Sequence, residues 1–380
     1  MKRPYRILLA DDSVTVRRLL SETLSRDPQL EVCLAARDGQ EAADQFAKLK
    51  PDVVLLDVEM PVMDGIEATV AIRRIDSRVP IVMFSSLTSE GGEATLDALQ
   101  HGATDYVTKP TRAGHLQNAI RHIEQELIPK LKHWGEWHHN RHSTIAKAVT
   151  KPAAPKGSGL VLRRASVLAD KAAGAPARGS SRIDLVAIGA STGGPNALAE
   201  VLSVLPKQFP APILITQHMP PLFTTLLANR LNEVCPLAVR EAVDGAEVLP
   251  GEVWIAPGDR HLVVQRDGTS VRLRLDLSPP ENSCRPAVDV MFRSIASVYL
   301  NRTLAVVLTG MGQDGTVGCR LLREQGSRVL AQDQASSVVW GMPRAVAEAG
   351  LAERILPLNE LGSEINRLVM SSHLTRSAAG

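Results

Sequence analysis

Residues 183–195 of this 380-residue chain read IDLVAIGASTGGP, an apolar run followed by a glycine-rich turn. A helical pattern follows from Asn196 to Leu205, so this segment is a strand–turn–helix unit and predicts an α/β fold. Ser191 lies on the turn, where its hydroxyl is exposed above the sheet and free N–H groups at the start of the helix can hold developing negative charge. We therefore treat Ser191 as a candidate nucleophile.

The spacing Gly189-x-Ser191-x-Gly193 matches the nucleophile elbow of serine hydrolases, but glycine-rich turns also bind phosphate or serve only as tight turns. The dinucleotide fingerprint requires glycine at the position of Ser191, and no Gly-Lys-Ser/Thr sequence completes a phosphate loop. A purely structural turn remains an alternative on this motif alone.

Length and composition define the class of protein. A chain of 380 residues is long enough for two domains, and 44% hydrophobic with 22% charged residues is typical of a soluble globular protein. No apolar stretch approaches the roughly 18 residues of a membrane span, and the first residues turn acidic at Asp11 before a signal-peptide core could form. We expect a cytoplasmic protein without direct membrane insertion. A net charge of +2 predicts no general attraction to nucleic acid.

The four cysteines are widely spaced and form no C-x-x-C pair, which favours reduced thiols over disulfides or a zinc site. They are Cys33, Cys235, Cys284 and Cys319.

The sequence divides into a first domain over residues 1–125, a basic, Ala/Pro-rich linker over 126–182 and a second domain over 183–375. Between residues 143 and 182 the only acidic residue is Asp170. Such a cationic segment is a solvated spacer that extends by self-repulsion, or it contacts an acidic partner or nucleic acid. Histidines 133, 138, 139 and 142 lie just upstream, and without carboxylate or thiol support we assign them no metal.

The first domain alternates short apolar runs with amphipathic helical stretches. The runs at 7–10, 32–35, 53–57, 81–84 and 105–107 read as five strands of a parallel sheet covered on both faces. Functional groups then gather at the carboxyl ends of the strands. The residues at those ends are Asp11, Asp12, Asp57, Ser85 and Lys109.

Three carboxylates at one sheet edge repel each other unless a cation joins them, and ligation by oxygen alone suits Mg²⁺. Asp57 would then accept a phosphoryl group, with Lys109 and the Ser85 hydroxyl holding its oxygens. A single aspartate at a strand end is usually a helix cap or turn residue. The joint placement of these groups is what favours a phosphorylation site.

Residues 1 to about 125 resemble the receiver domain of bacterial two-component response regulators. The resemblance lies in the Asp11-Asp12 pair, in Asp57 within LLDVEMPVMDG, and in Lys109-Pro110. It implies a flavodoxin-like (βα)5 fold, Mg²⁺ on Asp11, Asp12 and Asp57, and a histidine kinase as phosphodonor to Asp57. It also implies that Ser85, Tyr106 and Lys109 are switch residues, although Tyr106 could instead be a packing residue.

The second domain again alternates strands and helices, which predicts a second doubly wound parallel sheet. A strand over 212–216 leads to His218, and another over 303–308 leads to Asp314. Ser191, His218 and Asp314 can therefore meet at one edge of the sheet, with His218 as the base and Asp314 orienting its imidazole. The chain order Ser, His, Asp differs from that of the α/β-hydrolases, so the elbow motif does not imply their fold. Taken singly, each of the two is more often a capping or turn residue.

This half resembles the catalytic domain of the chemotaxis protein-glutamate methylesterases. The resemblance rests on IGASTGG at 188–194, QHMP at 217–220, CRPAVDV at 284–290, LTGMGQDG at 308–315 and VWGMP at 339–343. It implies Ser191, His218 and Asp314 as catalytic residues and the backbone N–H of Met311 as an oxyanion donor.

The implied activity is hydrolysis of glutamate methyl esters on chemoreceptor cytoplasmic helices, with methanol released and no cofactor for ester hydrolysis. Deamidation of receptor glutamines is implied as a second activity, because the same acyl-enzyme forms from a primary amide. The domain layout further implies that the unphosphorylated receiver inhibits and that phosphorylation of Asp57 activates.

Two other classes of protein are alternatives to this interpretation. A receiver joined to a binding module would carry a non-catalytic glycine turn at Ser191. A receiver-controlled nucleic-acid binder would require a helix-turn-helix or a basic recognition helix, and the sequence after Arg182 contains neither pattern.

Overall fold

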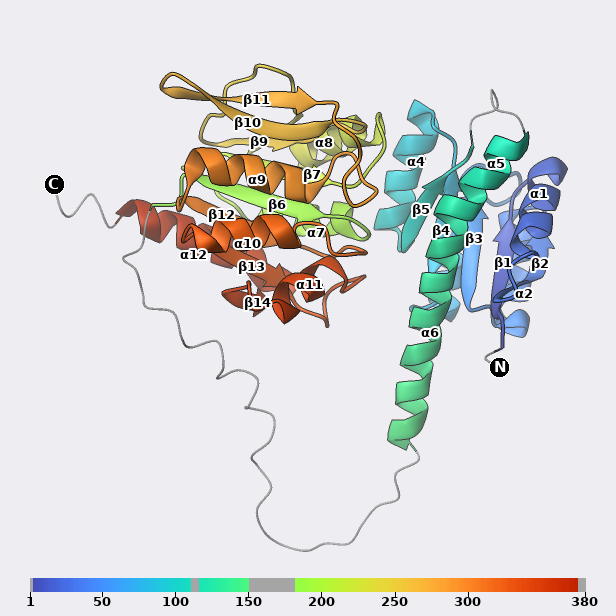
Figure 1. The fold of residues 1–380 in the computed structure, drawn as a ribbon. Coiled ribbons are helices and arrows are strands. Elements are labelled where there is room, and N and C mark those ends of the chain that lie inside the picture. Colours follow the sequence, from blue (N-terminus) through green and yellow to red (C-terminus); the bar gives the residue numbers. More distant parts are fainter. Residues whose placement is uncertain (1–2, 111–115, 150–181, 375–380) are drawn as a thin grey trace, which may run out of the picture. The chain divides into compact units, whose positions relative to one another are not determined.

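The computed structural model describes residues 3–110, 116–149 and 182–374. The chain forms two compact units, and the division between them falls within residues 150–181, outside the described ranges. The cationic part of the expected linker lies almost wholly in that undescribed stretch. Figure 1 shows the helices and strands of each unit.

The first unit contains a five-stranded sheet in the order β2-β1-β3-β4-β5, and every strand pair is parallel. Its strands are β1 (Tyr5–Ala10), β2 (Leu30–Ala36), β3 (Val53–Asp57), β4 (Ile81–Ser85) and β5 (Asp105–Thr108). The helices between them are α1 (Val14–Leu24), α2 (Gly39–Leu49), α3 (Gly65–Ile75) and α4 (Ser89–Gln100). All residues of β3 and β4 are buried, as continuous apolar strands inside a doubly covered sheet should be.

Short polar side chains begin these helices at the carboxyl edge of the sheet. Ser13 accepts a hydrogen bond from the Val16 N–H at the start of α1, and Asp64 forms a capping box with Glu67 at the start of α3. The five expected strands and the flavodoxin-like strand order are confirmed.

The C-terminal part of this unit corrects one expectation. Residues expected to belong to the linker from 126 onward are helical: α5 (Leu116–His122) continues through a π-helical turn η1 (Ile123–Leu127) into α6 (Ile128–Val149). Figure 1 shows α6 as the long helix beside the receiver sheet. Leu131 and Trp134 are fully buried, and the Trp134 indole donates a hydrogen bond to Asp105 Oδ2 at 3.3 Å. Tertiary contacts stabilise a helix whose weak apolar periodicity had indicated a linker.

The second unit contains a seven-stranded parallel sheet in the order β14-β13-β12-β6-β7-β9-β8. Its strands are β6 (Leu185–Ala190), β7 (Ile213–Gln217), β8 (Ala238–Glu241), β9 (Glu252–Ile255), β12 (Thr303–Val307), β13 (Arg328–Gln332) and β14 (Arg354–Leu356). A separate antiparallel hairpin joins β10 (His261–Asp267) to β11 (Ser270–Asp276).

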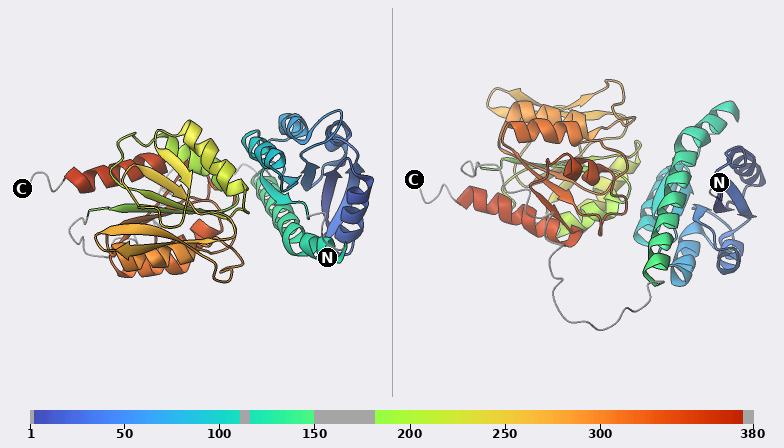
Figure 2. Two further views of the ribbon diagram at one scale, coloured as in Figure 1. Left: turned by 90° about the horizontal axis from the view of Figure 1, so that it is seen from above. Right: turned by 60° about the horizontal axis from the view of Figure 1, so that its bottom comes forward.

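Helices cover both faces of this sheet (Figures 1 and 2). One face carries α9 (Val288–Tyr299), α10 (Thr316–Glu324) and α11 (Met342–Glu348), and the other carries α7 (Gly194–Ser203), α8 (Phe223–Val234) and α12 (Leu358–Leu374). The predicted second doubly wound sheet is therefore confirmed. Its strand order reverses at β6, between β12 and β7, and such switch points are where ligands bind in open α/β sheets. Within the described ranges, no helix combines the length and the apolar character that a membrane span requires.

Candidate active site and phosphorylation site

Ser191 lies at the switch point of the second sheet, in the turn between β6 and α7. Its N–H donates to Thr309 O at 3.0 Å, and its carbonyl accepts from the Gly194 N–H at 2.7 Å. The Gln217 side chain donates a further bond to the Ser191 carbonyl at 2.9 Å. The ends of β6, β7 and β12 thus fix the backbone of the candidate nucleophile from both sides.

Gly310 packs against Ser191 so closely that there is no room for a side chain. A Cβ on Gly310 would lie 2.8 Å from Ser191 Cβ and 2.4 Å from Met342 Sδ. The next residue, Met311, has a backbone N–H that donates to no acceptor among the described residues. The Met311 N–H therefore stays the candidate oxyanion donor.

His218 and Asp314 follow the strands on either side of β6. The His218 N–H donates to Ala190 O at 3.1 Å, which places the histidine beside the serine turn. His218 Nε2 lies 2.8 Å from Asp314 Oδ2, so the structure brings together the expected base and its orienting carboxylate.

Two backbone N–H groups at the N-terminus of α9 bind the Asp314 carboxylate. The Val288 N–H donates to Oδ2 at 2.6 Å, and the Asp289 N–H donates to Oδ1 at 2.9 Å. Burial alone would raise the pKa of Asp314, but the hydrogen bond and charge of His218, with the two helix N–H groups, lower that pKa to about 2.

The second ring nitrogen of His218 faces a thiol rather than the serine. Nδ1 lies 3.5 Å from Cys284 Sγ, and no hydrogen bond joins the Ser191 hydroxyl to the imidazole in the described part of the chain. Burial alone would lower the pKa of His218, but the interactions with Asp314 and Cys284 raise it to about 9. Catalytic hydrogen bonds are often long or unformed without substrate, so this geometry leaves the role of His218 as base a prediction.

The expected metal ligands of the receiver unit converge at the edge of its sheet. Carboxylate oxygens of Asp11, Asp12 and Asp57 lie within 4.8 Å of one another. Lys109 Nζ lies 3.0 Å from Asp11 Oδ2 and 2.5 Å from Asp57 Oδ2. Burial raises the pKa of Asp57 to about 7 despite Lys109, and the Asp11 carboxylate adds to the rise. The Lys109 ammonium lies beside these carboxylates, and such oxygen ligands fit a divalent cation such as Mg²⁺.

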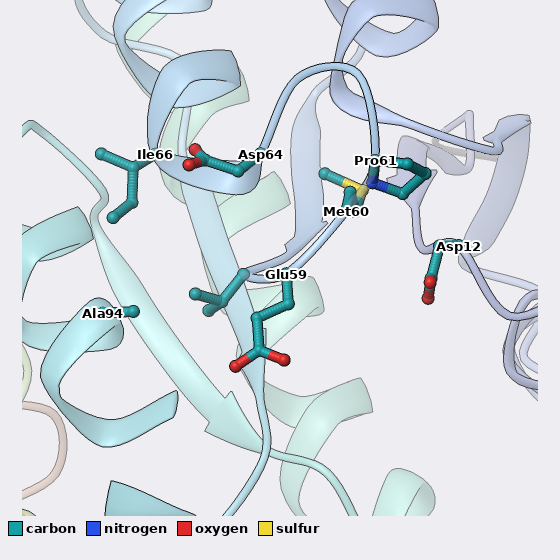
Figure 3. A pocket seen from close by; sticks show the side chains of 8 residues that line it. Asp12, Glu59, Met60, Pro61, Asp64, Ile66 and Ala94 are labelled. Carbon is teal, nitrogen blue, oxygen red and sulfur yellow. The ribbon is translucent and has the colours of Figure 1, made fainter. Parts of the chain in front are cut away.

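A pocket of about 500 Å³ borders this cluster (Figure 3). Asp12 belongs both to the pocket wall and to the expected metal ligands, and Glu59 and Asp64 add two further carboxylates to the wall. Met60 and Pro61, from the loop after β3, form part of its apolar lining. A phosphorylated donor that approaches here meets negative charge, which a bound divalent cation would offset.

The switch candidates Ser85 and Tyr106 lie on the neighbouring strands β4 and β5. Ser85 is fully buried, and its hydroxyl donates to Gly91 O in the first turn of α4 at 2.8 Å. Tyr106 is half-buried, and Lys130 Nζ lies 5.4 Å from the centre of its ring. The Ser85 hydroxyl must therefore leave α4 before it can bind a phosphoryl oxygen.

Comparison with known proteins gives a domain family for each of the two units. Residues 7–121 match the response regulator receiver domain, and residues 186–365 match the CheB methylesterase domain. A chain with these two parts is a response regulator whose output domain is an enzyme.

Relatives of full length give the family. The chain is 47% identical to the protein-glutamate methylesterase/protein-glutamine glutaminase of Trichodesmium erythraeum, over 96% of this chain and 99% of that one. It is 48% identical to the protein of the same name from Nocardioides sp., over 95% and 94% of the two chains. The chain is also similar to the crystal structure of the Thermotoga maritima CheB methylesterase catalytic domain. The two sequences are 46% identical, the match covers 49% of this chain and 99% of the Thermotoga chain, and the TM-score is 0.49. The chain belongs to the family of chemotaxis protein-glutamate methylesterases.

Two residues in contact with the His218–Asp314 pair carried no role in the sequence analysis. Cys284 faces His218 Nδ1, and the Asn282 amide donates to Asp314 Oδ1 at 2.9 Å. The CRPAVDV segment contains Cys284 but does not indicate where its thiol points. Asn282 lies two residues before that segment and carries no motif that would have marked it.

Proposed function

We propose that Ser191, His218 and Asp314 are the nucleophile, general base and orienting carboxylate of this methylesterase. The proposed substrates are glutamate methyl esters on the cytoplasmic helices of chemoreceptors, and the products are glutamate side chains and methanol. The observation that carries the proposal is the His218–Asp314 hydrogen bond at 2.8 Å, beside a serine turn fixed at the switch point of the sheet. Action on these helices implies a cytoplasmic protein.

The reaction follows from the positions of these groups. The Ser191 hydroxyl attacks the ester carbonyl while His218 accepts its proton, and Asp314 stabilises the resulting imidazolium. The Met311 N–H stabilises the negative charge on the carbonyl oxygen. His218 then donates that proton to the leaving methoxide oxygen, so that methanol departs and Ser191 is acylated. A water molecule activated by the same imidazole attacks the acyl-enzyme and releases the carboxylate.

A rotation of the His218 side chain precedes the first step in this scheme. Both ring nitrogens are engaged, by Asp314 and by Cys284, so the Ser191 hydroxyl gains a ring nitrogen only when the Cys284 contact opens. Substrate that fills the site would stabilise the rearranged form, because only differential binding shifts such an equilibrium.

The same groups support deamidation of receptor glutamines as a second activity. Attack by Ser191 on a primary amide gives the same acyl-enzyme, with ammonia leaving in place of methanol. Amides are poorer electrophiles than esters, so we expect this reaction to be slower.

The receiver unit supports control of this activity by phosphorylation at Asp57, with a chemotaxis histidine kinase as the proposed donor. A divalent cation on Asp11, Asp12 and Asp57 would supply charge that offsets the phosphoryl oxygens. Lys109 is within reach of the Asp57 carboxylate, and Ser85 would exchange its bond to Gly91 O for a phosphoryl oxygen. That exchange frees the first turn of α4, which gives phosphorylation a structural consequence.

Methanol release from methylated receptor membranes tests the proposal. Ser191→Ala should abolish release, and Ser203→Ala is the matched control because its side chain is exposed on α7. When Mg²⁺ and a small phosphoryl donor are added together, the wild type should release methanol faster. Equal release from Ser191→Ala and the wild type would end the esterase assignment and favour a phosphorylation-controlled binding module.

A further inference from the structure

A tight turn between β11 and α9 contacts both members of the His218–Asp314 pair. Glu281 and Cys284 exchange two backbone hydrogen bonds, at 3.0 and 2.9 Å, around Asn282 and Ser283. The central residues have φ values of 52° and 62°, the pattern of a type I′ turn. We call residues 281–284 the thiol turn.

The thiol turn is anchored from several directions. Arg293 on α9 forms two hydrogen bonds to the Glu281 carboxylate, both at 2.6 Å. The Asn282 amide donates to Asp314 Oδ1 at 2.9 Å and to Asp289 Oδ2 at 3.1 Å. The anchored turn places the Cys284 thiol 3.5 Å from His218 Nδ1.

The surroundings of Cys284 are those of a reactive cysteine. It is only partly buried, its sulfur faces an imidazole that can accept the thiol proton, and the other ring nitrogen of that imidazole is held by a carboxylate. A thiol with a histidine partner reacts as a nucleophile because the thiolate, not the thiol, attacks.

The other three cysteines lie in different surroundings and serve as internal controls. Burial raises the pKa of the thiols of Cys33 and Cys319, and it raises the pKa of Cys235 to about 11. Cys33 also donates to Ile7 O at 3.3 Å. These thiols should react slowly at neutral pH.

We propose that Cys284 is a peroxide-reactive modification site whose oxidation switches the esterase off. The thiol proton passes to His218 Nδ1, and the thiolate attacks one oxygen of a hydroperoxide. A sulfur–oxygen bond forms as the oxygen–oxygen bond breaks, and the leaving oxygen takes the proton from the imidazolium. For hydrogen peroxide the products are Cys284 sulfenic acid and water, and a dithiol reverses the oxidation.

The loss of activity has a steric and a chemical cause. The added oxygen lies between the thiol turn and His218, where it holds Nδ1 by a hydrogen bond. The imidazole is then unavailable to Ser191. This consequence rests on the proposed role of His218 in the esterase, whereas the reactivity of Cys284 does not.

The first experiment measures reactivity alone. The full-length protein is treated with iodoacetamide at neutral pH, and alkylation of each cysteine is followed by peptide mass spectrometry. We expect Cys284 to react about tenfold or more faster than Cys33 and Cys235, and we expect His218→Asn to slow Cys284 while Cys235 is unchanged. Alkylation of Cys284 no faster than the other thiols, or at the same rate in His218→Asn, would overturn the proposal.

The second experiment measures control of activity. Wild type and Cys284→Ser are exposed to hydrogen peroxide, and methanol release is compared with that of the same protein untreated. Wild type should lose most of its activity and recover it with dithiothreitol, whereas Cys284→Ser should keep its own untreated rate. Equal fractional losses in the two proteins would overturn the switch. An untreated wild type that releases no methanol would instead overturn the proposed function and leave the alkylation result standing.

Discussion

His218 Nε2 lies 2.8 Å from Asp314 Oδ2, while the first N–H groups of α9 bind the same carboxylate. The aspartate therefore connects a helix N-terminus to the candidate base. Because the hydrogen bond and charge of His218, together with the partial positive charge of that terminus, favour an anion, Asp314 stays ionised although burial opposes ionisation. The imidazolium form of His218 is favoured in turn, and this affects how the enzyme responds to pH.

Esterase activity should rise with pH up to about 9. His218 must be neutral to accept the Ser191 proton, and its pKa is raised to about 9 by Asp314 and Cys284, so the active form increases as pH approaches that value. Cys284→Ala removes one of the interactions that raise the pKa, so the rising limb should move to lower pH. The measurement is kcat/KM for methanol release against pH in both proteins. An unshifted limb in Cys284→Ala would show that the thiol does not act on the base.

Asp314→Asn should lower kcat by about 10³- to 10⁴-fold, because an amide does not stabilise the imidazolium and can favour the wrong tautomer. The effect is measured as single-turnover methanol release. The matched change is Glu348→Gln, which neutralises an exposed carboxylate on α11, and it should leave kcat unaltered. A kcat for Asp314→Asn within a few-fold of the wild type would contradict the proposed role of the aspartate.

The dependence of unfolding free energy on pH at acid pH gives an independent check on the ionised state of Asp314. Its pKa is lowered to about 2 in the folded protein, from an ordinary value near 3.8, so it contributes stability above about pH 4 that is lost as pH falls towards 2. Asp314→Asn should remove this contribution and flatten the dependence of unfolding free energy on pH in that range. Urea unfolding of the second unit at a series of pH values measures it. A slope equal to that of the wild type would show that the ionised carboxylate does not stabilise the fold.

The sequence allowed the strand ends that carry the candidate site residues to be placed in both units, because each of those parallel strands is a short apolar run and its polar residues follow it. Ser191, His218 and Asp314 could be brought to one edge for that reason alone. The contact between Cys284 and His218 could not, because it depends on a turn with two positive φ angles and on which way an imidazole faces. Helix α6 was missed for a different reason. Its own apolar pattern is weak, and contacts of Lys130 and Trp134 with Asp105 stabilise it instead.

Phosphorylation should require Asp12 as well as Asp57. Asp12→Asn removes one of the three carboxylates that fit a divalent cation, so acetyl phosphate should modify Asp57 only at much higher Mg²⁺ concentration, and Asp57→Asn should abolish modification. Phosphate incorporation is measured by intact-protein mass spectrometry across a Mg²⁺ titration. Asp44→Asn, an exposed change on α2, is the control. An unchanged Mg²⁺ requirement in Asp12→Asn would remove Asp12 from the metal site.

Trp134→Ala should destabilise the receiver unit by about 3–5 kcal/mol, because it deletes a fully buried indole and leaves a cavity between α6 and the sheet. It also removes one hydrogen bond to Asp105, which keeps the Lys130 ammonium at 3.0 Å. Gln125→Ala, an exposed change in η1, should alter stability by less than about 0.5 kcal/mol. The full-length protein is unfolded with a chemical denaturant, and hydrogen exchange in β1 and β3 monitors the receiver unit. This readout separates the loss of receiver stability from unfolding of the second unit. If Trp134→Ala were as stable as Gln125→Ala, α6 would be an appendage of the receiver, and the expectation of a linker beginning near residue 126 would be restored.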